Sequence, residues 1–289
     1  ATKYLLENQH QRAIARAGYA LKKIVPYLGE IPLERIHLGT LEPYVQARKL
    51  AGAKAGTINR EITVIRRILS LAARIWRDEQ GRPWIDTSPL LTRVPGPARK
   101  PRPITWDEQT RLFRELPGYL AEMALFAVNT GCRDQEVCGL RWEWECQVNG
   151  LTETVFVLPD SVTKNGRERI VPLNTIAASV IEGRRGIHSE WVFSWEGQRL
   201  NRMTNNAWRK ARKAVGLSDV RVHDLRHTFG LRLRAAGVSF EDRQDLLGHY
   251  AGRITTHYSR VEIDHLIECV EKLCEVERKP EIALVRRLG

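Results

Sequence analysis

Arginine, histidine and carboxylate side chains lie at helical spacings in two short segments. Arg133 and Glu136 are three residues apart in Thr130-Gly-Cys-Arg-Asp-Gln-Glu136, so the carboxylate can pair with the guanidinium and fix its direction. His223 and Arg226 are also three residues apart and would share one helix face. Histidine exchanges protons and arginine binds anions, so this second pair suits a phosphate better than a carbonyl. For the first pair, an ordinary surface ion pair is the alternative.

The segment His223-Asp-Leu-Arg-His227 also has the histidine spacing of a zinc-protease helix. That motif needs a glutamate directly after the first histidine as its general base, whereas this chain has Asp224. Arg226 would place a positive charge beside the cation. We therefore expect no metal site, and a zinc hydrolase is a distant alternative.

Two further segments contain a predicted turn and a pair of tyrosines. Lys164 precedes Asn165-Gly166, a dipeptide typical of tight turns. Leu247-Gly-His249 is followed at once by Tyr250 and, nine residues after the histidine, by Tyr258. A free phenol has a pKa near ~10 and needs activation. Spacing alone does not choose between the tyrosines, and core packing is the usual role of either.

The N-terminal third has the pattern of a helical domain. Apolar residues along 57–76 recur every three or four positions, which predicts one buried helix face. Arg60, Arg66 and Arg67 lie largely off this stripe, where a basic face could follow a phosphate backbone; a solvated face is the alternative. We expect helices throughout residues 1–90.

The C-terminal part combines helices with a small sheet. Thr105 and Glu108 have the spacing of a capping box that begins a helix. Residues 154–158 and 168–173 are expected to be strands on either side of the Asn-Gly turn. Helical patterns resume from about 174 to 272. The predicted fold class is mainly α with a small antiparallel β-sheet.

A proline-rich segment separates these two parts. Four prolines within residues 94–103 forbid a continuous helix and favour an extended linker. Arg99, Lys100 and Arg102 make it basic, which suits a segment that runs along DNA, although a plain spacer has the same composition. The expected domains on either side are residues 1–93 and 104–289.

The charge of the chain points to a polyanionic partner. Lysine and arginine number 46 against 34 acidic residues, a net charge of +12. Residues 1–100 alone contain 18 basic and 8 acidic residues. An excess concentrated in one part of the chain indicates nucleic acid more often than a merely solvated surface.

The number of cysteines and the length of the apolar runs exclude several classes of protein. The five cysteines are odd in number and form no C-x-x-C pair, which argues against a disulfide framework and a zinc ribbon. Reduced thiols fit the cytoplasm. The longest apolar run, Met123 to Val128, is far shorter than the ~18 residues of a membrane-spanning helix. We expect no membrane association.

In their order along the chain, these motifs resemble the tyrosine recombinase (phage integrase) family. The matching set is Arg133 in Thr-Gly-Cys-Arg-Asp-Gln-Glu, Lys164 at the turn, His223-Asp-Leu-Arg226, Leu-Gly-His249, and Tyr258 nine residues later. Thr57-Ile-Asn-Arg60 and Ser88-Pro89 are similar, more loosely, to the core-binding domain of the family. A departure is Tyr258-Ser-Arg260, because many members have a histidine two residues after the tyrosine. The resemblance implies an N-terminal helical core-binding domain and a C-terminal catalytic domain.

The resemblance implies site-specific recombination through a covalent intermediate. Tyr258 would attack a DNA phosphodiester, form a 3′-phosphotyrosyl bond and release a 5′-hydroxyl. This link keeps the bond energy, so rejoining needs no ATP. Lys164 would protonate the leaving 5′-oxygen, and His223 would take the tyrosine proton or assist later transfer. The choice of Tyr258 over Tyr250 also comes from the resemblance.

The remaining groups of the implied site are cationic or support a cation. Arg133 and Arg226 would donate hydrogen bonds to the non-bridging phosphate oxygens, and His249 would add another. Glu136 would orient Arg133 without touching DNA. Because these cations would neutralise the phosphate, neither a metal nor another cofactor is implied.

Double-stranded DNA and further copies of the chain are the implied partners. The two domains would clamp a duplex at a recombination site, a homo-tetramer would form on DNA, and accessory DNA-bending proteins could join it. The source would be bacterial or phage-encoded, acting in the cytoplasm. The expected DNA contacts are basic residues of both domains: Arg60, Arg66, Arg67, Arg99, Lys100, Arg102, Arg202 and Arg209.

The C-terminal tail from about residue 262 carries its own pattern. Six apolar residues lie at helical spacing along it: Ile263, Leu266, Ile267, Val270, Leu273 and Cys274. Such a stripe can be buried against its own domain or against another subunit. Family resemblance favours the neighbouring subunit, and we expect the tail to dock there.

Two other functions are compatible with parts of the pattern. A type IB topoisomerase uses the same kind of chemistry but rejoins each strand to itself. A DNA-binding regulator that has lost catalysis would keep the basic surfaces. The Leu-Gly-His249 motif and the complete residue set favour the recombinase.

Overall fold

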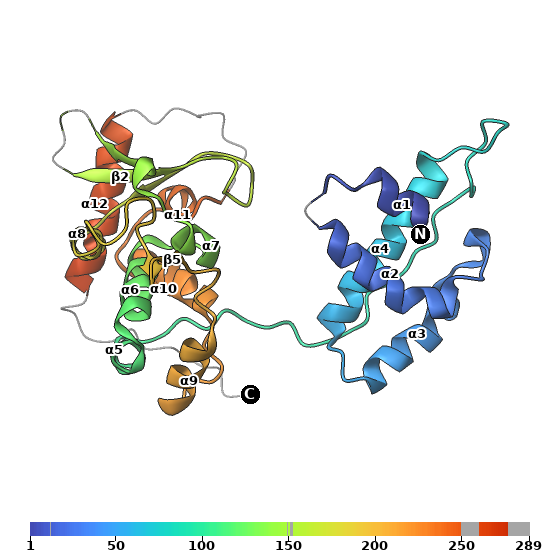
Figure 1. Cartoon of the computed structure of the whole chain (residues 1–289), viewed down its shortest axis with the longest axis horizontal. Helices are drawn as coiled ribbons and strands as arrows, with labels where there is room; N and C mark the ends of the chain where they lie inside the picture. Colours follow the sequence, from blue (N-terminus) through green and yellow to red (C-terminus); the bar gives the residue numbers. More distant parts are fainter. Residues whose placement is uncertain (12, 149, 151–152, 250–259, 277–289) are drawn as a thin grey trace. The chain divides into compact units, whose positions relative to one another are not determined.

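The computed structural model describes residues 1–11, 13–148, 150, 153–249 and 260–276 (Figure 1). The chain divides into two compact units, Ala1–Arg99 and Lys100–Gly289, each with its own hydrophobic core. The boundary between the units falls inside the predicted linker. None of the helices in the described ranges is long and apolar enough to cross a membrane.

The first unit is helical. Its elements are α1 (Thr2–Glu7), α2 (Ile14–Leu28), the 3-10 turn η1 (Leu33–Arg35), α3 (Leu38–Leu50) and α4 (Ala55–Arg74). Helix α2 packs against both α3 and α4. Ile58, Ile62 and Leu69 of α4 are fully buried, so the apolar stripe predicted from their spacing forms the core face.

A buried carboxylate ties α3 to α4. Glu61 Oε2 accepts hydrogen bonds from Tyr44 Oη at 2.6 Å and Arg48 Nε at 2.9 Å, and Arg48 Nη2 donates to Oε1 at 2.9 Å. Burial alone would raise the pKa of Glu61, but the Arg48 and Tyr44 hydrogen bonds hold it below its ordinary value. The group is therefore ionised and paired in the folded unit.

The chain leaves the helical pattern after Arg74, so the prediction of helices up to residue 90 is wrong for residues 75–90. Asp78 Oδ1 accepts hydrogen bonds from the backbone N–H groups of Gln80 and Arg82 at 3.0 and 2.8 Å. A carboxylate that binds nearby backbone N–H groups in a turn competes with helix formation.

The second unit is mostly helical with two small antiparallel sheets. Its helices are α5 (Trp106–Glu115), α6 (Gly118–Thr130), α7 (Asp134–Cys138), α8 (Thr175–Glu182), α9 (Asn206–Ala214), α10 (Val222–Ala235), α11 (Phe240–Leu247) and α12 (Arg260–Val276), with a 3-10 turn η2 (Trp142–Trp144). Helix α6 is central, because it packs against α5, α7, α8, α10 and α12. The predicted capping box opens α5, with Thr105 and Glu108 each accepting from the other's backbone N–H.

The larger sheet has the order β1-β2-β3, formed by β1 (Glu145–Gln147), β2 (Thr154–Leu158) and β3 (Arg169–Pro172). The predicted strands correspond to β2 and β3, in which Phe156 lies opposite Val171 and both side chains are buried. Sequence patterns did not predict β1. The fold class, mainly α with a small antiparallel sheet, is confirmed.

The connection between β2 and β3 is longer than a tight turn. Ten residues, 159–168, separate the strands, and Asn165-Gly166 turns the chain near the middle with Gly166 at φ +64°. Thr163 Oγ1 accepts from the Arg167 N–H at 3.1 Å and donates to its carbonyl at 2.6 Å. The turn is therefore placed correctly by the sequence, but it closes a loop and not a two-residue hairpin.

A second hairpin interrupts the region predicted to be helical between 174 and 272. Strands β4 (Ser194–Trp195) and β5 (Gln198–Arg199) pair across Glu196-Gly197. Both turn residues have positive φ, 50° and 71°, which gives the twist that short hairpins need.

Both ends of the proline-rich segment are anchored to the unit on their own side. On one side, Asn59 Nδ2 donates to the Val94 carbonyl at 2.9 Å, and the Val94 N–H donates to Asn59 Oδ1 at 2.8 Å. On the other side, Arg102 forms two short hydrogen bonds to Glu108 and one to Asp219.

Helix α12 corrects the prediction made for the C-terminal tail. Leu266, Val270 and Leu273 are buried in a cluster with Phe229 and Leu233 of α10, and the helix lies beside β3 (Figure 1). Docking of this stripe on a neighbouring subunit is therefore wrong for α12, because the stripe already covers the core of its own unit. Residues 277–289 lie outside the described ranges.

Replacing Glu61 by leucine should loosen the first unit selectively. The change leaves the Tyr44 hydroxyl and the Arg48 guanidinium without their acceptor, so we expect the opening free energy of α3 and α4 to fall by about 2–4 kcal/mol. Hydrogen exchange of peptides from these helices measures it. Glu42→Gln on the exposed surface of α3 is the control, with a change within about 0.5 kcal/mol. Equal protection in both variants would contradict the role given to Glu61.

Candidate active site

Arg133 lies where α6 ends and α7 begins. Gly131 ends α6 in the left-handed conformation, with φ +62°, and a β-carbon there would overlap the ring of Phe229. The Arg133 N–H donates to Glu136 Oε2 at 2.8 Å, and its Nη1 donates to Oε1 at 2.6 Å. The pairing predicted from the spacing is therefore present, and it fixes both the backbone and the guanidinium of Arg133.

Glu136 is shared with a second arginine that sequence reasoning missed. Arg169, the first residue of β3, donates from Nη1 to Glu136 Oε2 at 2.6 Å, and both side chains are almost completely buried. Burial alone would raise the pKa of Glu136, but Arg169 and Arg133 hold it below its ordinary value. The carboxylate is thus a buried anion between two guanidinium groups. The sequence shows only an arginine within the expected strand 168–173, and nothing in its spacing indicates that it is buried.

Arg226 of α10 joins this cluster. It donates from Nη1 to the Gly131 carbonyl at 2.6 Å and from Nη2 to the Leu247 carbonyl. Burial and the positive charges of Arg169 and Arg133 lower its pKa to about 9. Three guanidinium groups thus face one carboxylate, and the two unbalanced positive charges make the site ready for an anion.

His249 borders the same cluster. Gly248 ends α11 in the left-handed conformation, with φ +57°, and the His249 N–H donates to the Gln244 carbonyl at 2.8 Å. Burial, followed by the charges of Arg226, Arg133 and Arg169, lowers the pKa of His249. Neutral imidazole keeps an N–H that can donate to a phosphate oxygen.

His223 and His227 lie on α10 with their rings 4.8 Å apart, edge to face. Burial lowers the pKa of both, with His227 and Arg226 contributing for His223. Within the described ranges, neither histidine belongs to a group of three possible metal ligands. Such a group is formed elsewhere, by Asp242, His265 and Cys269.

The remaining predicted catalytic residues are Lys164 and Tyr258. Lys164 is exposed on the loop between β2 and β3. Tyr250 and Tyr258 lie outside the described residues. The structure therefore brings together Arg133, Glu136, Arg226 and His249, with His223 on the same helix as Arg226.

Most of the side chains predicted to contact DNA are exposed, but some are partly buried or already paired within the protein. Arg60, Arg67, Arg99, Lys100, Arg202 and Arg209 belong to exposed residues, and Arg209 also donates to Asn206 within α9. Arg66 is half-buried, and among the described residues its buried Nε has no hydrogen-bond partner.

Arg102 does not fit the prediction of a DNA contact. Its Nη1 and Nη2 donate to Glu108 at 2.6 and 2.7 Å, and its Nε donates to Asp219 at 3.1 Å. A guanidinium that already holds two carboxylates has little charge to offer a phosphate. Arg102 instead fastens the end of the linker to the second unit.

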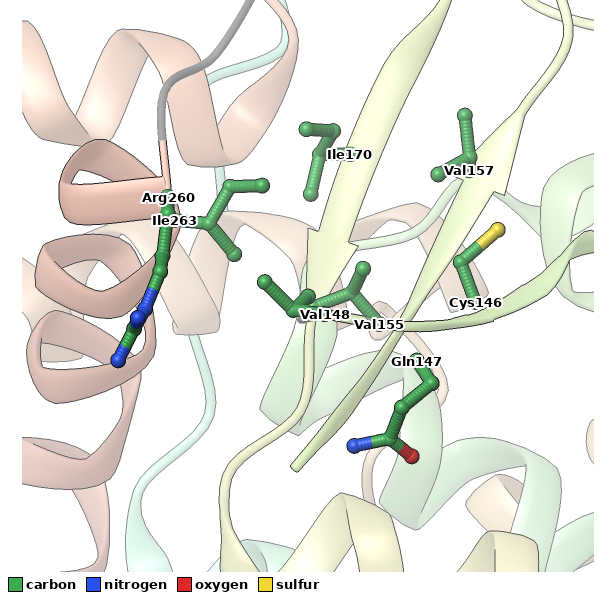
Figure 2. A pocket seen from close by; sticks show the side chains of 8 residues that line it. All are labelled: Cys146, Gln147, Val148, Val155, Val157, Ile170, Arg260 and Ile263. Atoms are coloured by element: carbon green, nitrogen blue, oxygen red, sulfur yellow. The ribbon is translucent and has the colours of Figure 1, made fainter. Parts of the chain in front are cut away.

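A cavity of about 370 Å³ lies on the outer side of the larger sheet, where α12 begins (Figure 2). It is lined by Cys146, Gln147, Val148, Val155, Val157, Ile170, Arg260 and Ile263. None of the predicted catalytic residues that the structure describes is among these lining residues, and the cavity walls are mainly apolar. The cavity is therefore separate from the arginine cluster formed by Arg133, Arg169 and Arg226.

Comparison with known proteins agrees with the motifs. Residues 104–265 match the sequence model of the phage integrase family, which is more than half of the chain. The chain belongs to the phage integrase family. The resemblance stated from the motifs is thereby confirmed.

Two curated relatives illustrate this membership. The integrase of Salmonella phage P22 is 28% identical over 246 residues, which is 80% of this chain and 59% of the relative. The tyrosine recombinase XerC of Rhodospirillum centenum is 28% identical over 257 residues, 83% of this chain and 72% of the relative. The chain thus spans about three fifths of the phage P22 integrase.

Solved structures show the same fold. A lambda integrase (75–356) dimer bound to a COC′ core site aligns with a TM-score of 0.67 at 20% identity, covering 89% of this chain and 96% of the other. A lambda integrase tetramer bound to a Holliday junction aligns with a TM-score of 0.62 at 19% identity, covering 86% and 74%. At these identities the likeness concerns the fold.

The histidines of the site should make the protein sensitive to mild acid. Their pKa values lie below the ordinary value in the folded chain, so between that value, near ~6.5, and the lowered one, the unfolded chain binds more protons. Stability should therefore fall as the pH is lowered through this window. Urea unfolding at several pH values from 7.5 to 5.5 measures the free energy of unfolding as a function of pH. Sulfate, which can fill the anion site, should make this free energy less dependent on pH.

The matched variant replaces His223, His227 and His249 together by glutamine. This protein should show a smaller loss of stability over the same pH range. An unchanged slope would show that other groups cause the acid sensitivity.

Proposed function

We propose that this chain is a tyrosine-type site-specific DNA recombinase that cuts and rejoins DNA through a 3′-phosphotyrosyl intermediate. The observation that carries the proposal is the arginine cluster in a chain of the phage integrase family: Arg133 pairs with the buried Glu136, and Arg226 binds the turn after α6 and the turn that leads to His249. The cluster supplies positive charge for a phosphate and needs no bound metal to do so.

The proposed reaction is an exchange of phosphoryl esters. The Tyr258 oxygen attacks phosphorus, the bond from phosphorus to the 5′-oxygen breaks, and the protein becomes linked to the 3′ side. Lys164 gives a proton to the leaving 5′-oxygen, and His223 accepts the phenol proton or assists later transfer. In the second step a 5′-hydroxyl from another strand attacks the phosphotyrosine and restores the diester, so no external energy source is needed.

The cationic cluster would act on the transition state. Arg133 and Arg226 donate to the non-bridging oxygens, whose charge grows as the phosphorus becomes five-coordinate. Arg226 already uses two N–H groups on the carbonyls of Gly131 and Leu247, and a guanidinium has five. The remaining N–H groups are available for a phosphate, while the two carbonyls hold the group in place.

The proposed partners are duplex recombination sites and further copies of the chain. The lambda integrase structures contain a dimer on a core site and a tetramer on a Holliday junction, which supports assembly of a homo-tetramer on DNA. Because the relatives come from a phage and a bacterium, we place this activity in the bacterial cytoplasm.

Trapping the covalent intermediate tests the proposed function. A nicked suicide substrate loses its 5′-hydroxyl strand after cleavage, so a protein–DNA adduct should accumulate with the wild type. Tyr258→Phe should abolish this adduct because the attacking oxygen is gone, and Tyr250→Phe should preserve it. Denaturing gels with labelled DNA measure the adduct.

Two further experiments test the need for a metal ion and distinguish a recombinase from a topoisomerase. The adduct should form equally well in EDTA, since the protein cations do the electrostatic work; strict dependence on a divalent ion would overturn this description of the site. Exchange of strands between two DNA sites distinguishes a recombinase from a type IB topoisomerase, which only relaxes DNA.

DNA binding should depend steeply on salt, with α4 contributing. Each phosphate neutralised adds a slope of about −0.9 in log K against log salt concentration. Replacing the exposed Arg60 and Arg67 by glutamate should reduce the slope by about 2 and weaken binding to all sequences alike. Fluorescence anisotropy measures both quantities. Arg114→Glu, on the exposed face of α5, is the control, and an equal effect there would refute a specific role of α4.

A further inference from the structure

Arg169 is a buried cation next to the proposed site. It is the first residue of β3, only 5% exposed, and it donates to Glu136, to the Thr130 carbonyl at 3.2 Å and to the Leu246 carbonyl at 2.6 Å. Its Nη1 also lies 3.9 Å from the sulfur of Cys132. Three separate chain segments therefore meet at a single guanidinium.

Arg169 and Arg226 bind the same two turns at neighbouring carbonyls. Arg169 takes the carbonyls of Thr130 and Leu246, and Arg226 takes those of the next residues, Gly131 and Leu247. These carbonyls belong to the C-terminal ends of α6 and α11, where backbone acceptors lack helical partners and the helix dipole favours a cation. The two arginines thus join two helix ends that are far apart in the sequence.

The hydrocarbon stem of Arg169 also packs against the turn that presents His249. A β-carbon at Gly248 would lie 2.8 Å from Arg169 Cδ, so glycine is required there for close approach as well as for its positive φ of 57°. The side chain of Arg169 therefore determines how closely the turn at Gly248 approaches β3.

We propose that Arg169 is a positioning residue, which holds the Arg133–Glu136 pair, the Arg226 guanidinium and the His249 turn in one rigid arrangement around the scissile phosphate. This assignment rests on the proposed function. Arg169 does not itself touch DNA, because its Nη groups are occupied and its Nε is buried, without a partner among the described residues. Its effect is transmitted through Glu136 and the two helix ends.

The test compares Arg169→Lys with Arg184→Lys. Arg184 is a matched control in the same unit: it is 7% exposed and donates to the carbonyls of Val192 and Ser194 and to Glu122, outside the arginine cluster. Lysine keeps the charge but bridges fewer acceptors. Melting temperatures and DNA affinity identify any general loss of folding, and Arg169→Gln is a second variant that places no charge at position 169.

Single-turnover cleavage of the suicide substrate is the first readout. Arg169→Lys should cleave about 100-fold more slowly than the wild type while binding DNA normally, because a shift of about 1 Å in positioned groups has an effect of this size. Arg184→Lys should stay within about threefold, as for a stability change away from the site.

A substrate with a neutral methylphosphonate at the scissile position is the second readout. It carries less charge in the transition state and needs the guanidinium groups less, so the defect of Arg169→Lys should shrink to less than about tenfold. A merely structural role would slow both substrates equally.

The outcomes are distinct. Equal defects on both substrates, or wild-type cleavage by both Arg169 variants, would overturn the assignment of Arg169 while leaving the proposed function intact. If the wild type itself formed no adduct, the proposed function would fail, and the role of Arg169 with it.

Discussion

A carboxylate buried among arginines is the interaction on which the rest of the site depends. Glu136 remains ionised away from water because Arg133 and Arg169 donate to both of its oxygens. Those cations in turn tolerate one another, and Arg226, because the carboxylate lies between them. Removing a single partner from such a group leaves an unpaired buried charge, which is far more destabilising than the intact group is stabilising. The cluster therefore forms as a whole, and its excess positive charge faces an anion.

The same cluster explains why two helices end where they do. Helices α6 and α11 both finish on a glycine in the left-handed conformation, Gly131 and Gly248. Each turn exposes carbonyls that arginines from β3 and α10 bind, so the ends of α6 and α11 become a single rigid edge. Rigidity matters for catalysis because a preorganised cation needs no rearrangement as charge develops on the phosphate. The first unit uses a similar device at Glu61, but there it joins only α3 to α4.

Much of the fold could be predicted because local patterns specified it. The stripe of α4, the capping box of α5 and the strands β2 and β3 were all predicted from the spacing of residues. Other features were not. Residues 75–90 leave the helix because the Asp78 carboxylate binds backbone N–H groups of its own turn. Strand β1 is too short and too exposed to show an alternation of apolar and polar residues. The apolar stripe of α12 gives no indication of which surface covers it. An apolar face requires burial, but only the packed structure decides that α10 covers it.

The candidate site likewise has features that the sequence predicts and features that only the folded structure shows. The family could be identified from the sequence alone, because the motifs around Arg133, Arg226 and His249 are short, have characteristic residue types and follow one another in a fixed order. The sequence also determined the pairing of Arg133 with Glu136, which is local. The tertiary structure alone decided that Arg169 shares Glu136, that Arg102 is held by Glu108 and Asp219, and that Gly131 and Gly248 lie at one edge. These contacts join residues distant in sequence, and hydrogen-bond partners brought together by packing leave no periodic signal in the chain.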